Sequence, residues 1–387
     1  MVSAAVKVFV IAGEPSGDKI GAEVLSSLFA RNGIEVRGIG GRAMEACGGF
    51  KSLFPIRQIA VMSMKDIIFR IFKLKALIKQ TCEELVAFEP DILITVDSPG
   101  FNRRVAAFAR QKFGKKVILV HCVAPSVWAY KPKRAKQYAQ LFDKLYCILP
   151  FEPQYFNPHG LDAEYLCYPP LRRLWRDIDQ ATQAKTSFDK RGNIYIMLSL
   201  GSRVSEVKMN LKMGLYFVKE IKKRYKAVFV IPTLEHILEE VDLRKHFEQE
   251  IIITSEEDRI KYLQIVDFAF CKSGTNATEA SLFYIPSVVF YKLDFVTFLF
   301  SLVYFAFSTF KRFSIINIIN DNGYIPEFIG PRCKKRDILN AMVNIIDDPN
   351  LPQLQRYWIQ QSMLALEKKA QPGLFGDIVV RKLFGDT

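Results

Sequence analysis

Short apolar runs alternate with amphipathic stretches along most of this 387-residue chain. Runs of roughly 4 to 8 apolar residues between turn residues are typical of buried parallel strands. In the first half they predict strands at 6–12, 34–39, 92–97, 117–123, 144–149 and 164–168. Helical patterns such as 64–88 and 102–112 lie between them. This alternation predicts a parallel sheet with helices on both faces.

The same alternation resumes in the second half. A polar stretch from Pro169 to Asn193 interrupts it and predicts a linker. The strands predicted beyond it are 194–200, 227–232, 250–254, 265–270 and 287–291, followed by helices at 335–347 and 351–368. The chain therefore predicts two doubly wound α/β domains, at 1–170 and 190–350, with a cleft between them. A last helix within 370–387 is expected to pack back on the first domain.

Charge and cysteine content narrow the class of protein. The formal charge is +14, and its basic clusters lie outside any nucleic-acid motif, so an anionic membrane or a phosphorylated substrate fits the charge as well as nucleic acid does. The seven cysteines form no CxxC pair, which indicates reduced thiols in a cytosolic protein. The four histidines are widely spaced, so we expect no His-based metal site.

An aromatic-rich stretch at 295–310 differs from the rest of the chain. It is shorter than the ~20 apolar residues that span a bilayer, and Lys311 and Arg312 follow it. It predicts a helix that lies in a membrane interface or contacts acyl chains, with a core helix as the alternative. The side chains expected to make this contact are Phe295, Phe298, Phe300 and Phe305.

The first predicted strand runs into the turn Ala12-Gly13-Glu14-Pro15-Ser16-Gly17-Asp18, and a helical stretch follows at 20–29. Glycines permit a sharp turn, Ser16 or Asp18 can cap the helix, and Glu14 is left at the carboxyl end of the strand. This turn is either an anion or substrate site of the α/β type or a simple capped turn.

Three further motifs are weaker indications of chemistry. Gly38-Ile39-Gly40-Gly41-Arg42-Ala43 matches the dinucleotide pattern, but it follows the second strand, and Asp66 lies inside a helical pattern. Residues 13–19 resemble a phosphate loop with spacing one residue short. Asp177-Ile178-Asp179 lies in the predicted linker and indicates solvated charge.

Stronger candidates lie where predicted strands end. Asp97 follows the apolar run 92–96, at the edge where an open α/β sheet presents its catalytic groups. Gly201-Ser202-Arg203 ends another strand before a helix, so backbone N–H groups, the helix dipole and a guanidinium can bind a diphosphate without a metal. Lys272 to Glu279 opens a further helix, in which Glu279 can accept both hydroxyls of a ribose. Separately, the turns at 201–203 and 272–279 could each be a simple capped turn, but together they indicate the nucleotide-sugar half of a two-domain glycosyltransferase.

The chain resembles the lipid-A-disaccharide synthase family over nearly its whole length. The segments that carry this resemblance are Ala12 to Asp18, Gly38 to Gly41, Asp97-Ser98-Pro99 with Phe101-Asn102, His121 to Ala129, Pro132-Lys133-Arg134, Leu149-Pro150-Phe151-Glu152, Gly201-Ser202-Arg203, Ser273-Gly274-Thr275 with Glu279, Asn317 and Pro326-Glu327. The Pro-Ser-x-Trp-Ala and Leu-Pro-Phe-Glu segments are specific to the family. The resemblance replaces the dinucleotide interpretation of Gly38 to Ala43 with that of a glycine-rich turn.

The resemblance implies an inverting glycosyltransferase of the GT-B fold in lipid A and lipopolysaccharide biosynthesis. It implies UDP-2,3-diacylglucosamine as donor and 2,3-diacylglucosamine 1-phosphate as acceptor, with a β-1,6-linked disaccharide 1-phosphate and UDP as products. It further implies a cytoplasmic protein held peripherally at the anionic inner membrane, with no nucleic acid, cofactor or metal. A homodimer is compatible with the sequence.

The resemblance also implies residue roles. Asp97 is expected to be the base, Arg203 to neutralise the departing diphosphate, and Glu14 and Ser16 to orient the acceptor. The expected donor-binding residues are Gly201, Ser202, Ser273, Gly274, Thr275, Glu279 and Asn317. The positions that depart from the family pattern are Gly100, Cys167-Tyr168, Leu200 and Ile316. Because Gly100 replaces an Asp, Asp97 is left as the only plausible carboxylate base in its loop.

Three other functions are compatible with parts of the sequence. A related UDP-sugar enzyme, such as an epimerase or a peptidoglycan-type transferase, would share the second half without needing the aromatic stretch. A nicotinamide oxidoreductase would bind its cofactor at the Gly38 turn. A lipid-binding scaffold would bind acylated sugar without turnover.

Overall fold

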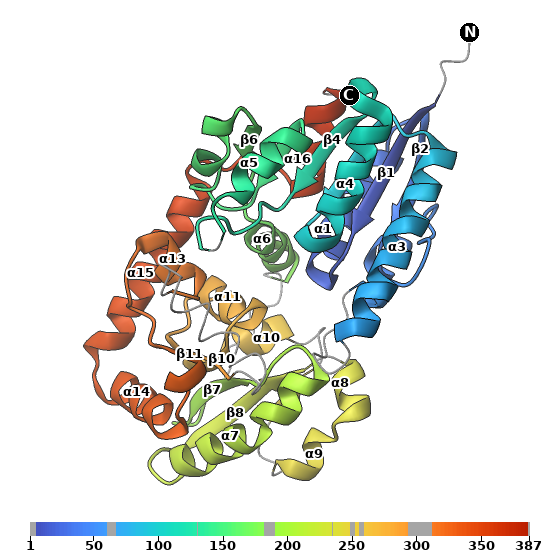
Figure 1. Cartoon of the computed structure of the whole chain (residues 1–387). Coiled ribbons are helices and arrows are strands. Elements are labelled where there is room, and N and C mark those ends of the chain that lie inside the picture. Colours follow the sequence, from blue (N-terminus) through green and yellow to red (C-terminus); the bar gives the residue numbers. More distant parts are fainter. Residues whose placement is uncertain are drawn as a thin grey trace. The chain divides into compact units, whose positions relative to one another are not determined.

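The computed structural model describes residues 5–59, 67–129, 131–181, 190–233, 235–247, 252–254, 259–292 and 312–385. The chain divides into two compact units (Figure 1). One consists of Met1–Arg173 with Leu366–Thr387, and the other is Leu174–Ala365.

The first unit is built on a parallel sheet of six strands in the order β2-β1-β3-β4-β5-β6. Its strands are β1 (Val6–Ala12), β2 (Ile34–Ile39), β3 (Ile92–Val96), β4 (Ile118–Cys122), β5 (Lys144–Cys147) and β6 (Asp162–Tyr165). Its helices are α1 (Pro15–Phe29), α2 (Arg42–Glu45), α3 (Ile67–Phe88), α4 (Pro99–Phe113), α5 (Arg134–Leu141), α16 (Phe375–Phe384) and the start of α6 (Pro169–Ala181). Short 3₁₀ turns lie at Ile56–Gln58, Gly114–Lys116, Pro153–Tyr155 and Asn157–His159.

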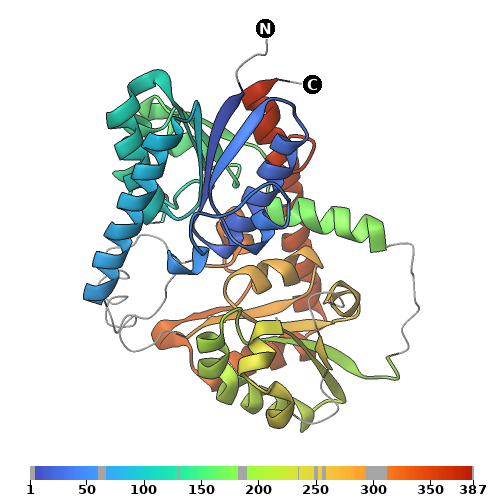
Figure 2. The same cartoon turned by 90° about the vertical axis from the view of Figure 1, so that its right-hand side faces the viewer.

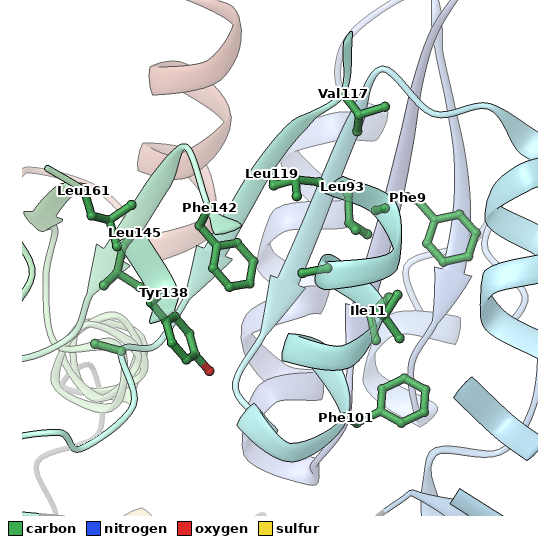
Figure 3. Close-up of a cluster of buried hydrophobic side chains, with 14 of the residues drawn as sticks. Phe9, Ile11, Leu93, Phe101, Val117, Leu119, Tyr138, Phe142, Leu145 and Leu161 are labelled. Carbon is green, nitrogen blue, oxygen red and sulfur yellow. The ribbon is translucent and has the colours of Figure 1, made fainter. Parts of the chain in front are cut away.

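Helices cover both faces of this sheet, as the sequence predicts (Figure 2). Side chains alternate between the faces of a strand, so Phe9 and Ile11 of β1 join a core with α3 and α4. Val8 and Val10 join a second core with α1 and α16. Figure 3 shows Phe9, Ile11 and Phe101 in the first of these cores. The run Val6–Ala12 is almost wholly apolar because both of its faces are covered.

The last helix, α16, packs on α1 (Figure 2). The Ser27 hydroxyl donates to the Asp377 carboxylate, which fixes the two helices together. A Cβ on Gly376 would lie 2.2 Å from the backbone carbon of Glu23. The close contact between these helices therefore requires glycine at this position.

The second unit repeats the architecture, with a parallel sheet in the order β12-β11-β10-β7-β8-β9. Its strands are β7 (Ile194–Ser199), β8 (Ala227–Pro232), β9 (Ile252–Thr254), β10 (Phe268–Lys272), β11 (Ser287–Tyr291) and β12 (Glu327–Ile329). Its helices are α7 (Val204–Lys222), α8 (Glu235–Glu240), α9 (Leu243–His246), α10 (Arg259–Leu263), α11 (Thr275–Leu282), α13 (Ile315–Asn320), α14 (Lys335–Asp347) and α15 (Asn350–Glu367), with a 3₁₀ turn at Gly330–Arg332. Phe217 of α7 stacks on Phe270 of β10, with ring centroids 4.4 Å apart, inside its core.

Within the predicted linker, residues 169–181 form a helix, α6, and the boundary between the two units falls inside it, between Arg173 and Leu174. Two prolines begin this helix. The N–H groups of the first turn have no acceptor within a helix, so proline, which lacks an N–H, costs no helical hydrogen bond there. Leu171 and Leu174 recur at helical spacing and are buried, so a stretch that looks polar overall is an amphipathic helix. The Asp177-Ile178-Asp179 segment accordingly lies within α6.

Candidate functional site

In each sheet, successive strands are added first on one side of the starting strand and then on its other side. In the first unit β1 lies between β2 and β3, and in the second β7 lies between β8 and β10. Open α/β sheets bind ligands outside the carboxyl ends of the strands, at the point where the side changes. The turns that follow β1, β3, β7 and β10 hold most of the predicted site residues.

Asp97 directly follows β3 in an unusual backbone conformation. Asp97 and Ser98 have φ values of +52° and +47°, a left-handed region that costs a non-glycine residue of order 1–3 kcal/mol. The buried Asn102 amide holds this turn by donating to the carbonyls of Val96 at 3.1 Å and Asp97 at 2.7 Å. The surroundings therefore fix where the Asp97 carboxyl lies.

The Asp97 carboxyl faces the turn that follows β1. Its Oδ1 accepts from the Ser98 N–H at 2.8 Å, and the Ser16 hydroxyl donates to its Oδ2 at 3.5 Å. Burial raises the pKa of Asp97, while these two hydrogen bonds oppose the shift. A Cβ on Gly13 would lie 2.3 Å from the Ser98 Cβ, so only glycine lets the two turns pack this closely. The structure thus brings Ser16 and Asp97 together.

The capping role predicted for Ser16 or Asp18 is wrong. Helix α1 begins at Pro15 with Glu14 as its N-cap residue, which places Ser16 and Asp18 in the first turn. The buried Asp18 carboxylate instead accepts backbone N–H groups of Gly41 at 2.6 Å, Ala43 at 2.9 Å and Met44 at 3.3 Å.

This Asp18 contact explains the glycine-rich turn at 38–41. A Cβ on Gly41 would lie 2.6 Å from Asp18 Oδ2. The N–H groups at the start of α2 already bind a carboxylate of the protein, so they are not available to the pyrophosphate of a dinucleotide. The turn anchors α2 to α1.

Glu152 connects two of the segments that carry the family resemblance, a role that the sequence did not reveal. It is almost fully buried, and its Oε2 accepts from the N–H groups of Ile148 at 3.2 Å and Leu149 at 3.0 Å. Trp128 Nε1 donates to its Oε1 at 3.4 Å. Burial raises the pKa of Glu152 to about 7. Glu152 therefore shapes the loops that follow β4 and β5.

In the second unit, the turn after β7 is organised by a glutamate one helical turn further on. Arg203 is the N-cap residue of α7 and is 45% exposed. Glu206 Oε2 accepts from the Ser202 N–H at 3.1 Å. Gly201 has φ +136°, and a Cβ there would lie 2.6 Å from the Glu206 Cβ. Glycine is thus required for the carboxylate to reach back over the turn.

The turn after β10 lies beside the turn after β7. Asn276 Nδ2 donates to the hydroxyl of Ser199, the last residue of β7. Gly274 has φ +123° and precedes α11, in which Glu279 is half-buried. The side chain of Thr275 lies outside the described residues.

Asn317 lies in α13 and is buried. Its Nδ2 donates to the Ile325 carbonyl at 2.8 Å, and its Oδ1 accepts from the Ile325 N–H at 3.0 Å. Nearby, the Glu327 carboxylate accepts from the N–H groups of Phe313 and Ser314. These two side chains shape the loop around α13.

The predicted contact residues Phe295, Phe298, Phe300 and Phe305 lie outside the described residues. Within the described ranges, no helix is both long and apolar enough to cross a membrane. The same part of the chain contains no group of three or more His, Cys, Asp or Glu side chains placed to hold a metal ion.

A family model and the sequence relatives agree on one family. A family model described as lipid-A-disaccharide synthetase matches residues 8–372. The lipid-A-disaccharide synthase of Rickettsia prowazekii is 37% identical over 344 residues, covering 88% of this chain and 89% of the relative. That of Rickettsia akari is 35% identical over 381 residues, covering 98% and 96%.

Solved structures show the fold. A structure of S. aureus MnaA with UDP has a TM-score of 0.62 at 12% identity and covers 98% of this chain and 96% of its own. UDP-GlcNAc 2-epimerase from Neisseria meningitidis bound to UDP-GlcNAc has a TM-score of 0.61 at 13% identity, with coverage of 98% and 100%. Acinetobacter baumannii MurG has a TM-score of 0.53 at 12% identity, with coverage of 97% and 98%. At these identities the likeness shows a shared fold of two Rossmann-like domains.

Proposed function

Since the chain belongs to the lipid-A-disaccharide synthetase family, we propose that Asp97 is the general base of its reaction and that Arg203 binds the donor's diphosphate. The protein is a GT-B glycosyltransferase that forms the lipid A disaccharide. Neither the epimerase nor the oxidoreductase alternative is favoured by the family match.

In the proposed step, Asp97 takes the proton of the 6-hydroxyl of 2,3-diacylglucosamine 1-phosphate. The freed oxygen attacks the anomeric carbon of UDP-2,3-diacylglucosamine from the face opposite UDP. The new C–O bond forms as the bond to the β-phosphate oxygen breaks, and UDP leaves with that electron pair. The observation that carries this proposal is the carboxyl held at the end of β3, because its burial raises its pKa and makes it a stronger base. Glu14 and Ser16, on the facing turn, are proposed to orient the acceptor.

The donor is proposed to bind at the turns after β7 and β10. The N–H groups at the start of α7, with Arg203, would neutralise charge that develops on the departing diphosphate. Glu279 would bind the ribose hydroxyls. The other donor-binding residues proposed are Gly201, Ser202, Ser273, Gly274 and Thr275. Asn317 would act through the loop that it holds.

A direct assay tests this function. The purified protein, UDP-2,3-diacylglucosamine and radiolabelled acceptor are combined in detergent with EDTA, and the products are separated by thin-layer chromatography. A new disaccharide phosphate that Asp97→Ala fails to make would support the proposal. Binding of UDP-sugar without any product would favour another nucleotide-sugar reaction on the same fold.

Ser16→Ala is expected to shift the pH dependence of turnover. The Ser16 hydroxyl bond lowers the pKa of Asp97, so its loss raises that pKa. Since the base must be deprotonated, the acidic limb of kcat should move to higher pH, by less than about one unit because the bond is long. Rates across a pH series measure this shift. Ser26→Ala, on the same helix but away from Asp97, should leave the limb unchanged.

We further propose that the protein acts at an anionic membrane surface through residues 295–310. Replacing Phe298, Phe300 and Phe305 together by Ser is expected to weaken binding to anionic liposomes about tenfold, because less apolar surface enters the interface. Co-sedimentation measures the binding, and circular dichroism monitors the fold. A misfolded product would instead identify the stretch as a core helix.

A further inference from the structure

Lys272, the last residue of β10, has a shielded ammonium group. Its side chain is 14% exposed, and its Nζ donates to Glu206 Oε1 at 2.8 Å. The same Nζ lies 4.7 Å from the centroid of the Tyr291 ring and 4.0 Å from where a Gly274 Cβ would be. The ammonium therefore lies next to Gly274 and is bonded to the residue that organises the turn after β7.

Glu206 binds several groups of this turn at once. Its side chain is 11% exposed. Besides Lys272, it binds the Ser202 N–H through Oε2 at 3.1 Å, and Arg203 Nη1 lies 3.8 Å from its Oε1. One carboxylate thus contacts a backbone donor and two cations. Gly201 makes this possible by lacking the Cβ that would collide with Glu206.

We propose that Lys272 is a second diphosphate-binding cation of the donor site, and that the Glu206 carboxylate competes with the diphosphate for it. This inference rests on the proposed role of Gly201-Ser202-Arg203 in binding the donor. The groups that Glu206 contacts, an ammonium, a guanidinium and a backbone N–H, are those that bind phosphate oxygens in proteins.

Charge at this turn favours a second cation. The diphosphate of a nucleotide sugar carries two negative charges, and the departing UDP gains another. Arg203 supplies one positive charge and the start of α7 about half of one. A shielded ammonium interacts more strongly with phosphate than an exposed one, because the local dielectric is lower. Glu206 has the opposite effect, since its negative charge repels the diphosphate.

A second lysine–carboxylate pair in the same unit provides a matched control. Asp267 accepts from the Tyr195 N–H at 2.8 Å and from Lys190 Nζ at 2.5 Å, so it also joins a backbone donor to a lysine. This pair lies at the amino ends of β7 and β10, the opposite edge of the sheet from Lys272. Loss of either pair removes one partly buried ion pair, but only the Lys272 pair lies at the proposed donor turns.

The test is calorimetric titration of the full-length protein with uridine, UMP and UDP. Lys272→Met is expected to weaken UDP binding about tenfold or more, UMP binding less, and uridine binding not at all. Lys272→Arg should retain most of the UDP affinity. Glu206→Gln should tighten UDP binding several-fold. Lys190→Met and Asp267→Asn should leave the affinity for all three ligands unchanged.

Three results would overturn the inference. An equal loss of affinity for uridine and for UDP in Lys272→Met would mean that the lysine only supports the fold. An unchanged affinity for UDP in that variant would mean that the lysine makes no diphosphate contact. Weaker UDP binding in Glu206→Gln would show that the carboxylate helps the diphosphate rather than competing with it. If Lys272→Met fails to fold, Lys272→Gln decides the matter, because an amide still donates to Glu206 but carries no charge.

Arg203→Ala separates this inference from the proposed function. A loss of UDP affinity in Arg203→Ala but not in Lys272→Met would overturn the Lys272 inference alone. Unchanged UDP affinity in Arg203→Ala, or no UDP binding by the unaltered protein, would overturn the proposed donor site and the inference with it.

Discussion

Asp97→Asn is expected to lower kcat by about 10² to 10⁴-fold while UDP affinity stays unchanged. An asparagine has nearly the same shape, and its oxygen can still accept from the Ser98 N–H, but the amide cannot take a proton from the acceptor hydroxyl. The turn itself should persist, because the Asn102 amide and the Asp97 N–H hold it through backbone groups. Initial rates with saturating donor and acceptor measure the loss.

The pH dependence provides the sharper test of the same role. Burial raises the pKa of Asp97, so kcat/KM of the unaltered protein should fall at acid pH with an apparent pKa above the usual range for aspartate. The residual activity of Asp97→Asn should lack this limb. Asp91→Asn is the matched control, since Asp91 precedes the same strand at its opposite end and binds the Lys7 N–H. Near-full turnover of Asp97→Asn with an unchanged pH profile would rule out Asp97 as the base.

The sequence predicts every described strand except β12 (Glu327–Ile329), with some ends displaced by two or three residues, as at β10 (Phe268–Lys272). There is a physical reason for this. Both faces of each sheet are covered, so strands such as Val6–Ala12 and Ile92–Val96 are continuous apolar runs that stand out from the polar turns. The carboxyl ends of such strands then locate Asp97 and Arg203. The helix at residues 169–181 is not apparent in the sequence because a high mean polarity hides an amphipathic helix that begins with proline.

Partners distant in the sequence could not be predicted in this way. Asp18 and Gly41 are 23 residues apart, and Lys272 and Glu206 are 66 apart, so periodicity gives no information about either contact. The family resemblance does not supply the roles either. Asn317 and Glu327 both carry the resemblance, yet their side chains bind backbone groups of a loop. A shared motif thus marks a position without distinguishing chemistry from loop geometry.

Asp18→Ala is expected to destabilise the first unit by about 3 kcal/mol. The change removes the acceptor of two short hydrogen bonds, from Gly41 and Ala43, and of a longer one from Met44. Each buried N–H left without an acceptor costs roughly 1–3 kcal/mol, and water entering the new space would recover part of that cost. Since a chain with two units need not unfold in one step, hydrogen–deuterium exchange of residues 38–50 is the better measurement. Protection there should fall by about two orders of magnitude.

Glu45→Ala is the control for this effect, because Glu45 is in α2, the short helix whose N–H groups Asp18 binds, and accepts one exposed N–H, from Ser52 at 3.3 Å. Its loss should change stability by no more than about 0.5 kcal/mol. If Asp18→Ala loses no more protection than Glu45→Ala, the Asp18 bonds do not anchor the glycine-rich turn. If Asp18→Ala instead loses activity while residues 38–50 keep full protection from hydrogen exchange, Asp18 belongs to the active site. The buried carboxylate would then act on substrate rather than on the fold.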